Sequence, residues 1–211
     1  MSACGFVGRT RDFVCYVNNA RPDAGFAGTL TLTAVDLHSG ASAAWATLPV
    51  STGAGPGALA WLTPPNATLP DANTSVLIAR LTDAASARVF DEHLVHLTAP
   101  VNLRVARAAV AAAVAPAPNA DGSVDVAVTT DAVALFVTLT AGAPGRFSDN
   151  AFTLLPGAPR TIRWLPFAPG DAAANRALLA ASLRVEDLSA YVEAGGGARG
   201  GEWRAGGGGG R

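Results

Sequence analysis

The sequence contains no lysine, so all 15 of its basic residues are arginine. This absence excludes a Schiff-base lysine or a lysine general base within the chain. Charged residues make up only 15% of the 211 residues, and the formal net charge at pH 7 is −1. Such a balanced charge gives no electrostatic reason to expect nucleic acid or an anionic membrane as a partner. We therefore expect neither.

Cysteine is also scarce, since Cys4 and Cys15 are the only two in the chain. Two cysteines are too few for a disulfide scaffold, and no residues show the paired spacing of metal ligands. The sequence leaves open whether these two cysteines pair with each other. We expect no metal and no cofactor.

Long apolar runs are missing as well, and no window reaches the 18 or so residues of a membrane span. Residues 1–9 lack the apolar core of a secretory signal. A (β/α)8 barrel typically needs about 250 residues and alternating strand and helix patterns. Neither the length nor the patterning of this chain provides one.

Half of the residues are apolar, which is ample for a core, and strand-like runs bounded by Gly, Pro, Asn or Asp recur along the chain. No convincing helical period extends over three turns. Two sandwiches of about 100 residues each fit the length. The predicted fold class is therefore all-β, with two tandem β-sandwiches and a disordered Gly-rich C-terminal tail.

The first predicted sandwich spans residues 10–99. Alternation of Thr or Asp with apolar residues in 29–37 directs Leu30, Leu32 and either Val35 or Leu37 inward. A domain boundary is expected at Pro100, because proline removes a ladder donor and restrains the residue before it. The expected strands are residues 13–17, 29–37, 44–50, 58–62, 76–81 and 87–97.

The second predicted sandwich spans residues 100–192. A short helix is expected at 171–181, because Ala, Leu and Arg favour one. Residues 193–211 are dominated by glycine and cannot bury enough apolar area to offset chain entropy, so we expect a disordered tail. The expected strands are residues 103–114, 123–130, 133–140, 151–154, 160–164 and 182–188.

Residues 145–157 read Gly-Arg-Phe-Ser-Asp-Asn-Ala-Phe-Thr-Leu-Leu-Pro-Gly and are followed by a strand-like Pro-Arg-Thr-Ile-Arg-Trp at 159–164. This run resembles the signature near the end of β-mannosidases, the family-two glycoside hydrolases that cleave terminal β-mannosides. Asn18-Asn19 followed by residues 26–37 is similar to the opening of the preceding sandwich in the same enzymes. The resemblance covers roughly residues 10–190 and implies the C-terminal immunoglobulin-like domains, without the catalytic barrel.

The resemblance implies a parent enzyme that releases terminal non-reducing β-D-mannose by the retaining mechanism, in carbohydrate or glycoprotein catabolism. Such enzymes often work in lysosomes, in vacuoles or outside the cell. The chain itself would be a non-catalytic support, with the parent's barrel as its partner and mannose-containing glycans as a further one. The alternative is a free-standing β-sandwich module that binds a carbohydrate or a protein, because a fold alone does not fix function.

The glutamates provide no glycosidase site of their own. A retaining glycosidase needs two carboxyl groups about 5–5.5 Å apart on a rigid scaffold. No glutamate stands in a context that matches the family's catalytic motifs, so we predict that the chain alone is inactive. All four are expected at the solvated surface: Glu92, Glu186, Glu193 and Glu202.

Two other groups of residues invite a functional reading and have a simpler structural one. His93 and His96 could suggest a metal, but a spacing of three on a strand points their side chains to opposite faces. Residues 147–150 could contact sugar, yet Ser, Asp and Asn side chains commonly stabilise a tight turn. We expect a structural turn flanked by two aromatic anchors: Phe147, Ser148, Asp149 and Asn150, with Phe152 as the second anchor.

Aromatic residues and glycan acceptors complete the candidates. Trp45, Trp61 and Trp164 fall in strand-like runs, where burial is the more frequent outcome, so we expect only Trp203 to be free. N-glycosylation sequons begin at Asn66 and Asn73 in a Pro-rich loop. They matter only if the protein enters a secretory path.

Overall fold

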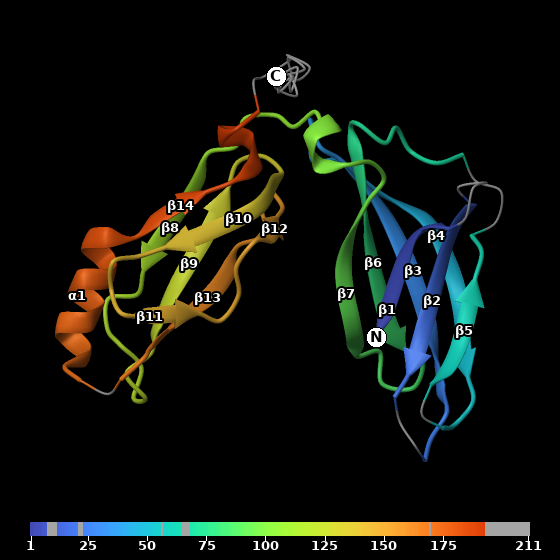
Figure 1. The fold of residues 1–211 in the computed structure, drawn as a ribbon, viewed down its shortest axis with the longest axis horizontal. Helices are drawn as coiled ribbons and strands as arrows, with labels where there is room; N and C mark the ends of the chain where they lie inside the picture. The colour runs from blue at the N-terminus through green and yellow to red at the C-terminus, as the bar shows by residue number, and fades with distance from the viewer. Residues whose placement is uncertain (8–11, 21–22, 56, 65–67, 169, 193–211) are drawn as a thin grey trace, which may run out of the picture.

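The computed structural model describes residues 1–7, 12–20, 23–55, 57–64, 68–168 and 170–192. Within them, two β-sandwiches follow one another along the chain and lie side by side (Figure 1). The all-β prediction is confirmed, whereas the tail predicted at 193–211 lies outside the described residues. In the described part of the chain, no helix is long and apolar enough to cross a membrane.

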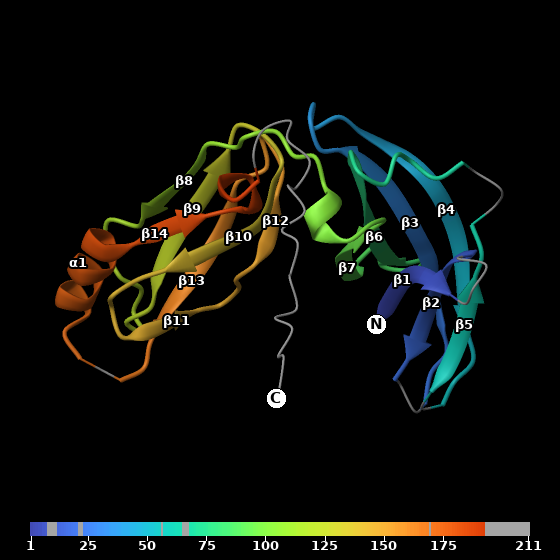
Figure 2. The ribbon, with the colours of Figure 1, turned by 45° about the horizontal axis from the view of Figure 1, so that its top comes forward.

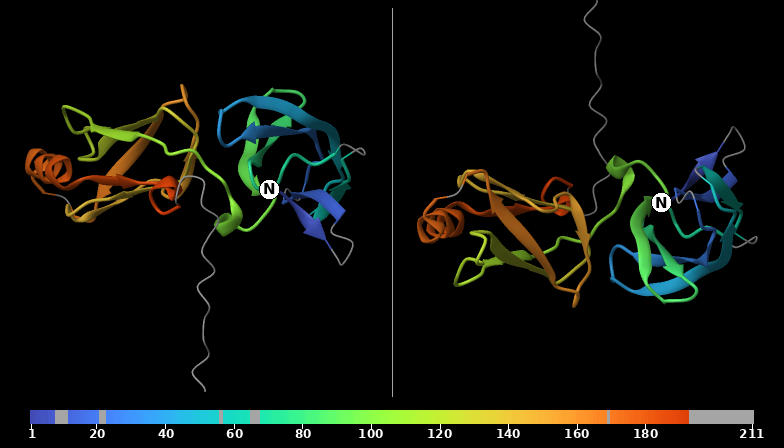
Figure 3. Two further views of the ribbon diagram at one scale, coloured as in Figure 1. Left: turned by 90° about the horizontal axis from the view of Figure 1, so that it is seen from above. Right: turned by 90° about the horizontal axis from the view of Figure 1, so that it is seen from below.

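The first sandwich is built from strands β1 to β7, all paired antiparallel. One sheet has the order β1-β2-β5, and the facing sheet has the order β4-β3-β6-β7. Figure 3 looks along these strands and shows the two sheets around a common core. The strands are β1 (Ser2–Val7), β2 (Asp12–Asn19), β3 (Phe26–Asp36), β4 (Ser42–Thr52), β5 (Ala58–Leu62), β6 (Ser75–Asp83) and β7 (Val89–His96).

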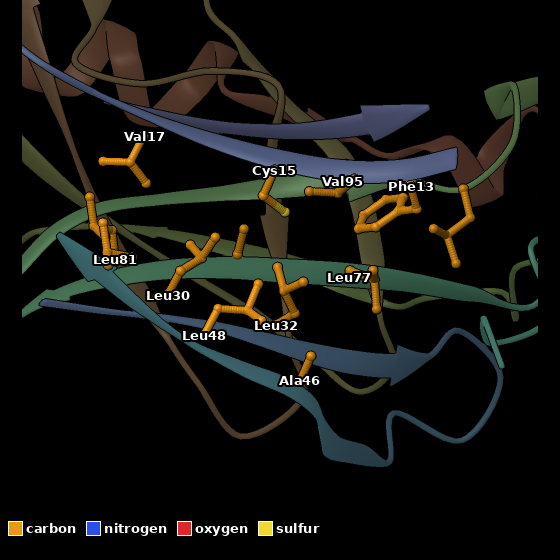
Figure 4. Packing of buried hydrophobic residues seen from close by; sticks show 13 residues of the cluster. Phe13, Cys15, Val17, Leu30, Leu32, Ala46, Leu48, Leu77, Leu81 and Val95 are labelled. Carbon is orange, nitrogen blue, oxygen red and sulfur yellow. The ribbon is translucent and has the colours of Figure 1, made fainter. Parts of the chain in front are cut away.

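Alternation along the strands fills this core. Leu30 and Leu32 of β3 are fully buried, as predicted, and they meet Cys15 of β2 from the opposite sheet (Figure 4). Val35 and Leu37 are buried too, although they belong to a separate cluster between the two sandwiches. Side chains at every second position reach the core because successive strand residues point to opposite faces.

Strand β1 was not expected from the sequence. It pairs with β2 so that Cys4 lies directly opposite Cys15, and the two form a disulfide. Small residues dominate its first half, so propensity and alternation give no local strand signal there. The pairing with β2 and the disulfide, both contacts with residues outside the strand itself, define the strand instead.

The second sandwich contains a four-stranded sheet of order β11-β13-β9-β8 and a three-stranded sheet of order β12-β10-β14. Trp164 is fully buried between them. The strands are β8 (Val110–Val114), β9 (Val124–Thr130), β10 (Ala134–Thr140), β11 (Gly145–Phe147), β12 (Phe152–Leu154), β13 (Arg160–Pro166) and β14 (Arg184–Glu186).

One helix, α1 (Ala172–Ser182), confirms the helical prediction for this region. The Asp171 carboxylate begins it by accepting hydrogen bonds from the backbone N–H groups of Ala173 and Ala174. This N-cap satisfies donors that have no partner within the first turn. Leu179 fixes the helix to the sandwich, because its side chain is buried in the core.

The strand predicted at 103–114 is wrong in its first half, since β8 begins only at Val110. Residues 103–109 lie between the sandwiches, where Leu103 and Val105 are buried in the cluster that joins them. Their apolar alternation reflects this interdomain burial rather than a sheet. The boundary expected at Pro100 coincides with the 3-10 helix η1 (Pro100–Asn102), which separates β7 from β8.

The joining cluster takes residues from both sandwiches. From the second sandwich comes Phe136, which sits in β10 where the pairing with β12 shifts register between Ala134 and Val137. Phe136 adopts φ 55°, a left-handed conformation that is strained for an aromatic residue. This irregularity allows Leu135 and Phe136, neighbours in sequence, both to join the interdomain cluster.

Candidate functional site

Residues 145–157 lie along one side of the second sandwich, from β11 to the turn beyond β12. Gly145 packs against the indole of Trp164, and a β-carbon at this position would overlap that ring and the carbonyl oxygen of Leu165. Because Trp164 is fully buried and cannot shift outward, glycine is the residue that fits here. The motif's first glycine is therefore a packing requirement of the core.

Ser148 and Asp149 tie the turn to strand β13. The backbone N–H of Ser148 donates to the carbonyl of Arg163 at 2.7 Å, and the Ser148 hydroxyl accepts from the Arg163 N–H at 3.0 Å. The Asp149 carboxylate accepts from the Asn150 N–H at 2.8 Å and from the Arg160 guanidinium at 2.6 Å. These contacts continue the β11–β13 pairing beyond the end of β11.

Asn150 ties the same turn to the opposite sheet. Its side-chain oxygen accepts from the Leu139 N–H at 2.7 Å, and its side-chain nitrogen donates to the Leu139 carbonyl at 3.0 Å. The amide group thus takes the place of a backbone partner for β10. Phe152 follows in the core, with the Arg160 guanidinium over its ring, whereas Phe147 is only half-buried. The structural role of residues 147–150 stays a prediction that unfolding measurements can test.

The described glutamates do not meet. Glu92 forms an exposed ion pair with Arg80 in the first sandwich, at 2.6 Å. Glu186, in the second sandwich, accepts a hydrogen bond from the Tyr191 hydroxyl at 2.6 Å, and this bond raises the pKa of Tyr191. The paired carboxylates of a retaining glycosidase lie a few ångströms apart. Glu92 and Glu186 belong to different sandwiches and have separate partners, so they do not form such a pair. Glu193 and Glu202 lie outside the described residues.

The two histidines of β7 point to opposite faces of their sheet. His93 lies opposite Ala79 on the core side, while His96 lies on the side of the interdomain cluster and stacks on Phe136. Burial lowers the pKa of both imidazoles, and the nearby Asp91 carboxylate partly opposes this effect at His93. Among the described residues, no group of three or more His, Cys, Asp or Glu side chains could hold a metal ion.

The burial of the tryptophans differs in part from the prediction. Trp164 is buried, and Trp45 is half-buried beside Phe13, with its indole N–H donating to the Thr68 carbonyl at 3.1 Å. Trp61 is 63% exposed, so its predicted burial is wrong. It lies on the outer face of edge strand β5, where Leu59 is exposed as well. Trp203 lies outside the described residues.

Of the two sequons, only the one at Asn73 falls within the described residues. Asn73 sits in the turn before β6, where its N–H donates to the Asp71 carboxylate at 2.9 Å. Its carbonyl accepts from the Arg104 N–H at 2.7 Å, near the junction of the two sandwiches. The turn is therefore held by its backbone, and the side-chain amide is partly exposed. Asn66 lies outside the described residues.

Residues 105–191, which make up the second sandwich, match the family model described as an Ig-fold domain, Ig_mannosidase. The second sandwich is an Ig-fold domain of the mannosidase type. Its motif residues 145–157 fall within the matched range. No curated protein matches the chain.

Solved structures resemble the chain beyond the mannosidase-type domain alone. The β-D-mannosidase from Dictyoglomus thermophilum aligns with 89% of this chain and 21% of its own length, at 16% identity and a TM-score of 0.63. The exo-chitosanase from Amycolatopsis orientalis aligns with 89% of this chain and 25% of its own, at 18% identity and a TM-score of 0.53. At these identities the likeness establishes the fold of both sandwiches. The chain spans about a fifth to a quarter of either enzyme.

The sequence interpretation did not identify Tyr16 as a candidate functional residue. Tyr16 lies directly opposite Trp61 in the first sandwich, outside the mannosidase-type domain. A local signal was available, because Phe13, Cys15 and Val17 alternate inward in β2 and thereby direct Tyr16 outward. The signal for Trp61 was absent, since alternation in β5 does not say which of its two faces meets the core. Only the pairing of β5 with β2 decides that.

Proposed function

We propose that this chain is the non-catalytic, immunoglobulin-like portion of a β-mannosidase-like glycoside hydrolase. The observation that supports it best is the family match of residues 105–191, which contain the motif that first suggested this family. The structural alignment extends the likeness over both sandwiches in order, and over a fraction of a larger enzyme. The proposed parent activity is hydrolysis of terminal non-reducing β-D-mannose residues.

The two sandwiches would act as a firm support for the parent's catalytic barrel, which is the proposed partner. A support must keep its parts in a fixed relation, and the interdomain cluster supplies apolar contacts for this purpose. Seven of its residues are buried, and they lie in or directly next to β3, β6 and β10 or in the linker. In this proposal the chain contributes stability and shape, and the chemistry belongs to the barrel.

The proposed setting is an oxidising compartment. Disulfides such as Cys4–Cys15 persist in secreted and lumenal proteins and are rare where thiols are kept reduced. We also propose that Asn73 accepts an N-glycan there, because its turn lies at the surface and is held through the backbone rather than the side chain. Expression in a secretory host should give a glycosidase-sensitive mass increase at this site. Asn73→Gln should lose the increase, and an unmodified wild-type Asn73 would contradict the proposal.

Immunodepletion tests the functional proposal. An antibody raised against residues 105–191 should remove β-mannosidase activity from an extract of the source cells, because the sandwich and the barrel belong to one assembly. Pre-immune serum is the control and should leave the activity in the supernatant. If the antibody removes the chain completely while the activity remains, the proposal is wrong.

A further inference from the structure

Tyr16 and Trp61 form a pair of aromatic side chains on the outer face of the β1-β2-β5 sheet. The two residues lie directly opposite each other in the β2–β5 register, and their ring centroids are 5.7 Å apart. The ring planes are tilted by 50°, so neither ring covers the face of the other. Trp61 is 63% exposed, an unusual state for a tryptophan within a strand.

The strands beneath this pair hold it in place. Cys15 and Val17 flank Tyr16 in β2 and are buried on the core side of the sheet. The disulfide to Cys4 adds a covalent link between β1 and β2 next to Tyr16. A pair on a rigid, cross-linked sheet loses little freedom when a ligand binds, which favours recognition by preformed surfaces.

Among the described residues, the immediate neighbours of the pair on this face of the sheet are uncharged. Ala3 lies opposite Tyr16 on β1, and Val14, Asn18 and Leu59 are the next residues on the same face of β2 and β5. The nearest carboxylate on β2 that shares this face, Asp12, lies beyond Val14 at the strand's end. Aromatic rings with a neighbouring exposed amide, that of Asn18, suit a neutral ligand that has both C–H faces and hydroxyl groups.

We infer that Tyr16 and Trp61 form a binding platform for a neutral oligosaccharide of β-linked pyranose units. The apolar face of a pyranose stacks on an aromatic ring, and the Asn18 amide can exchange hydrogen bonds with its hydroxyls. The centroid separation is close to the spacing of adjoining sugar rings in a β-1,4-linked chain. The tilt between the rings fits a chain whose successive units are turned relative to one another.

The size of the exposed apolar surface favours a sugar over a protein partner. Among the described residues of this face, the large apolar side chains that are clearly exposed are Trp61 and Leu59, the latter at 44%. One aromatic side chain buries about 150–250 Å² at most, whereas a standard protein interface takes about 800 Å² from each partner. A patch of this size suits one or two sugar rings.

The platform is also placed where a ligand can reach it. Strand β5 lies on the side of the first sandwich away from the second, in both Figure 1 and Figure 2. The contacts between the sandwiches instead involve β3, β6 and β7. This inference goes beyond the proposed support function, and neither depends on the other. A sugar could bind here whether or not the chain belongs to a β-mannosidase.

A titration with β-1,4-mannohexaose tests the inference on the full chain. The indole N–H signal of Trp61, identified by its loss in Trp61→Phe, should shift in nitrogen-labelled protein with saturation. Trp61→Ala and Tyr16→Ala should each weaken binding by about tenfold or more, while Trp61→Phe should keep most of it. Phe167→Ala is the matched control, because Phe167 is an aromatic residue 72% exposed on the second sandwich. Melting curves establish that each variant is folded.

Several results would overturn the inference. One is the absence of a saturable shift with mannohexaose, and another is unchanged binding in a folded Trp61→Ala variant. Equal affinity for maltohexaose, whose α-links give a differently curved chain, would remove the assignment to β-linked sugars. Self-association that Trp61→Ala abolishes, in protein that binds no sugar, would identify the patch as a protein contact instead.

Discussion

The imidazole of His96 stacks on the phenyl ring of Phe136, with centroids 5.2 Å apart and planes inclined by 15°. The two rings belong to different sandwiches, so this contact joins the domains. Phe136 reaches it with a left-handed backbone, φ 55°, which costs of order 1–3 kcal/mol. Contacts between the sandwiches must offset that cost, which makes the stack a sensitive point of the interdomain cluster.

A double-mutant cycle should detect this contact. Phe136→Ala is expected to lower the free energy of unfolding by about 1–2 kcal/mol, less than for a fully buried phenylalanine because the ring is half-buried. His96→Ala in the same background should then cost less than it does alone, by about 0.5–1.5 kcal/mol. Urea denaturation measures all four proteins. Fully additive effects would show that the rings are not coupled.

Stability should fall as the pH drops below the usual histidine pKa of about 6.5. Burial lowers the pKa of His93 and His96 in the folded protein, so below pH 6.5 the unfolded chain binds protons first. The loss should level off below the folded-state pKa values, and these groups should add no slope above pH 7.5. Urea midpoints measured between pH 5 and 8 check the prediction. A slope that persists unchanged in a His93→Leu/His96→Leu variant would contradict it.

Reduction of the Cys4–Cys15 disulfide should destabilise the first sandwich. The bond closes a short loop, with a sequence separation of 11, and such a cross-link typically contributes about 2–3 kcal/mol. Cys15 is fully buried. The Cys4→Ala/Cys15→Ala variant lacks the disulfide, so it should show a similar loss of stability and no further response to reductant. Urea unfolding with and without a phosphine reductant makes the comparison. Equal midpoints for the wild type under both conditions would refute the prediction.

The turn at residues 147–150 should contribute to stability in a graded way. Asn150→Ala is expected to cost about 2 kcal/mol, because it leaves both backbone groups of Leu139 without their partner. Asp149→Ala should cost about 1 kcal/mol, since its ion pair is exposed and its backbone contact is single. Phe147→Ala should cost less than the roughly 3 kcal/mol of a fully buried ring. Unchanged unfolding midpoints together with weakened sugar binding would reassign the turn as a ligand site.

The purified chain should not hydrolyse p-nitrophenyl β-D-mannopyranoside. A retaining site needs two carboxyl groups about 5–5.5 Å apart, and the described glutamates, Glu92 and Glu186, stand in separate sandwiches. Release of nitrophenolate measured by absorbance checks this prediction. Turnover that disappears in Glu92→Gln or Glu186→Gln would show that the chain has a glycosidase site of its own.

Much of the fold followed from local pattern. Strict alternation in β3 is enough to direct Leu30 and Leu32 inward, since successive strand residues point to opposite faces in any sheet. Helix α1 was foreseeable because Ala, Leu and Arg, which favour a helix, dominate residues 171–181. The motif at 145–157 indicated the mannosidase-type domain through its resemblance to that family, and the structure shows that its Gly145 meets a packing requirement set by Trp164.

The tertiary structure decided what depends on distant partners. Alternation in β5 separates two faces but does not say which is buried, and only pairing with β2 leaves Trp61 outside. Strand β1 has no local signal and exists through β2 and the disulfide. The left-handed Phe136 is unfavourable by itself and is held by contacts with the other sandwich. In each case the energy comes from pairing or packing with residues outside the element itself, so the amino-acid pattern of the element could not reveal it.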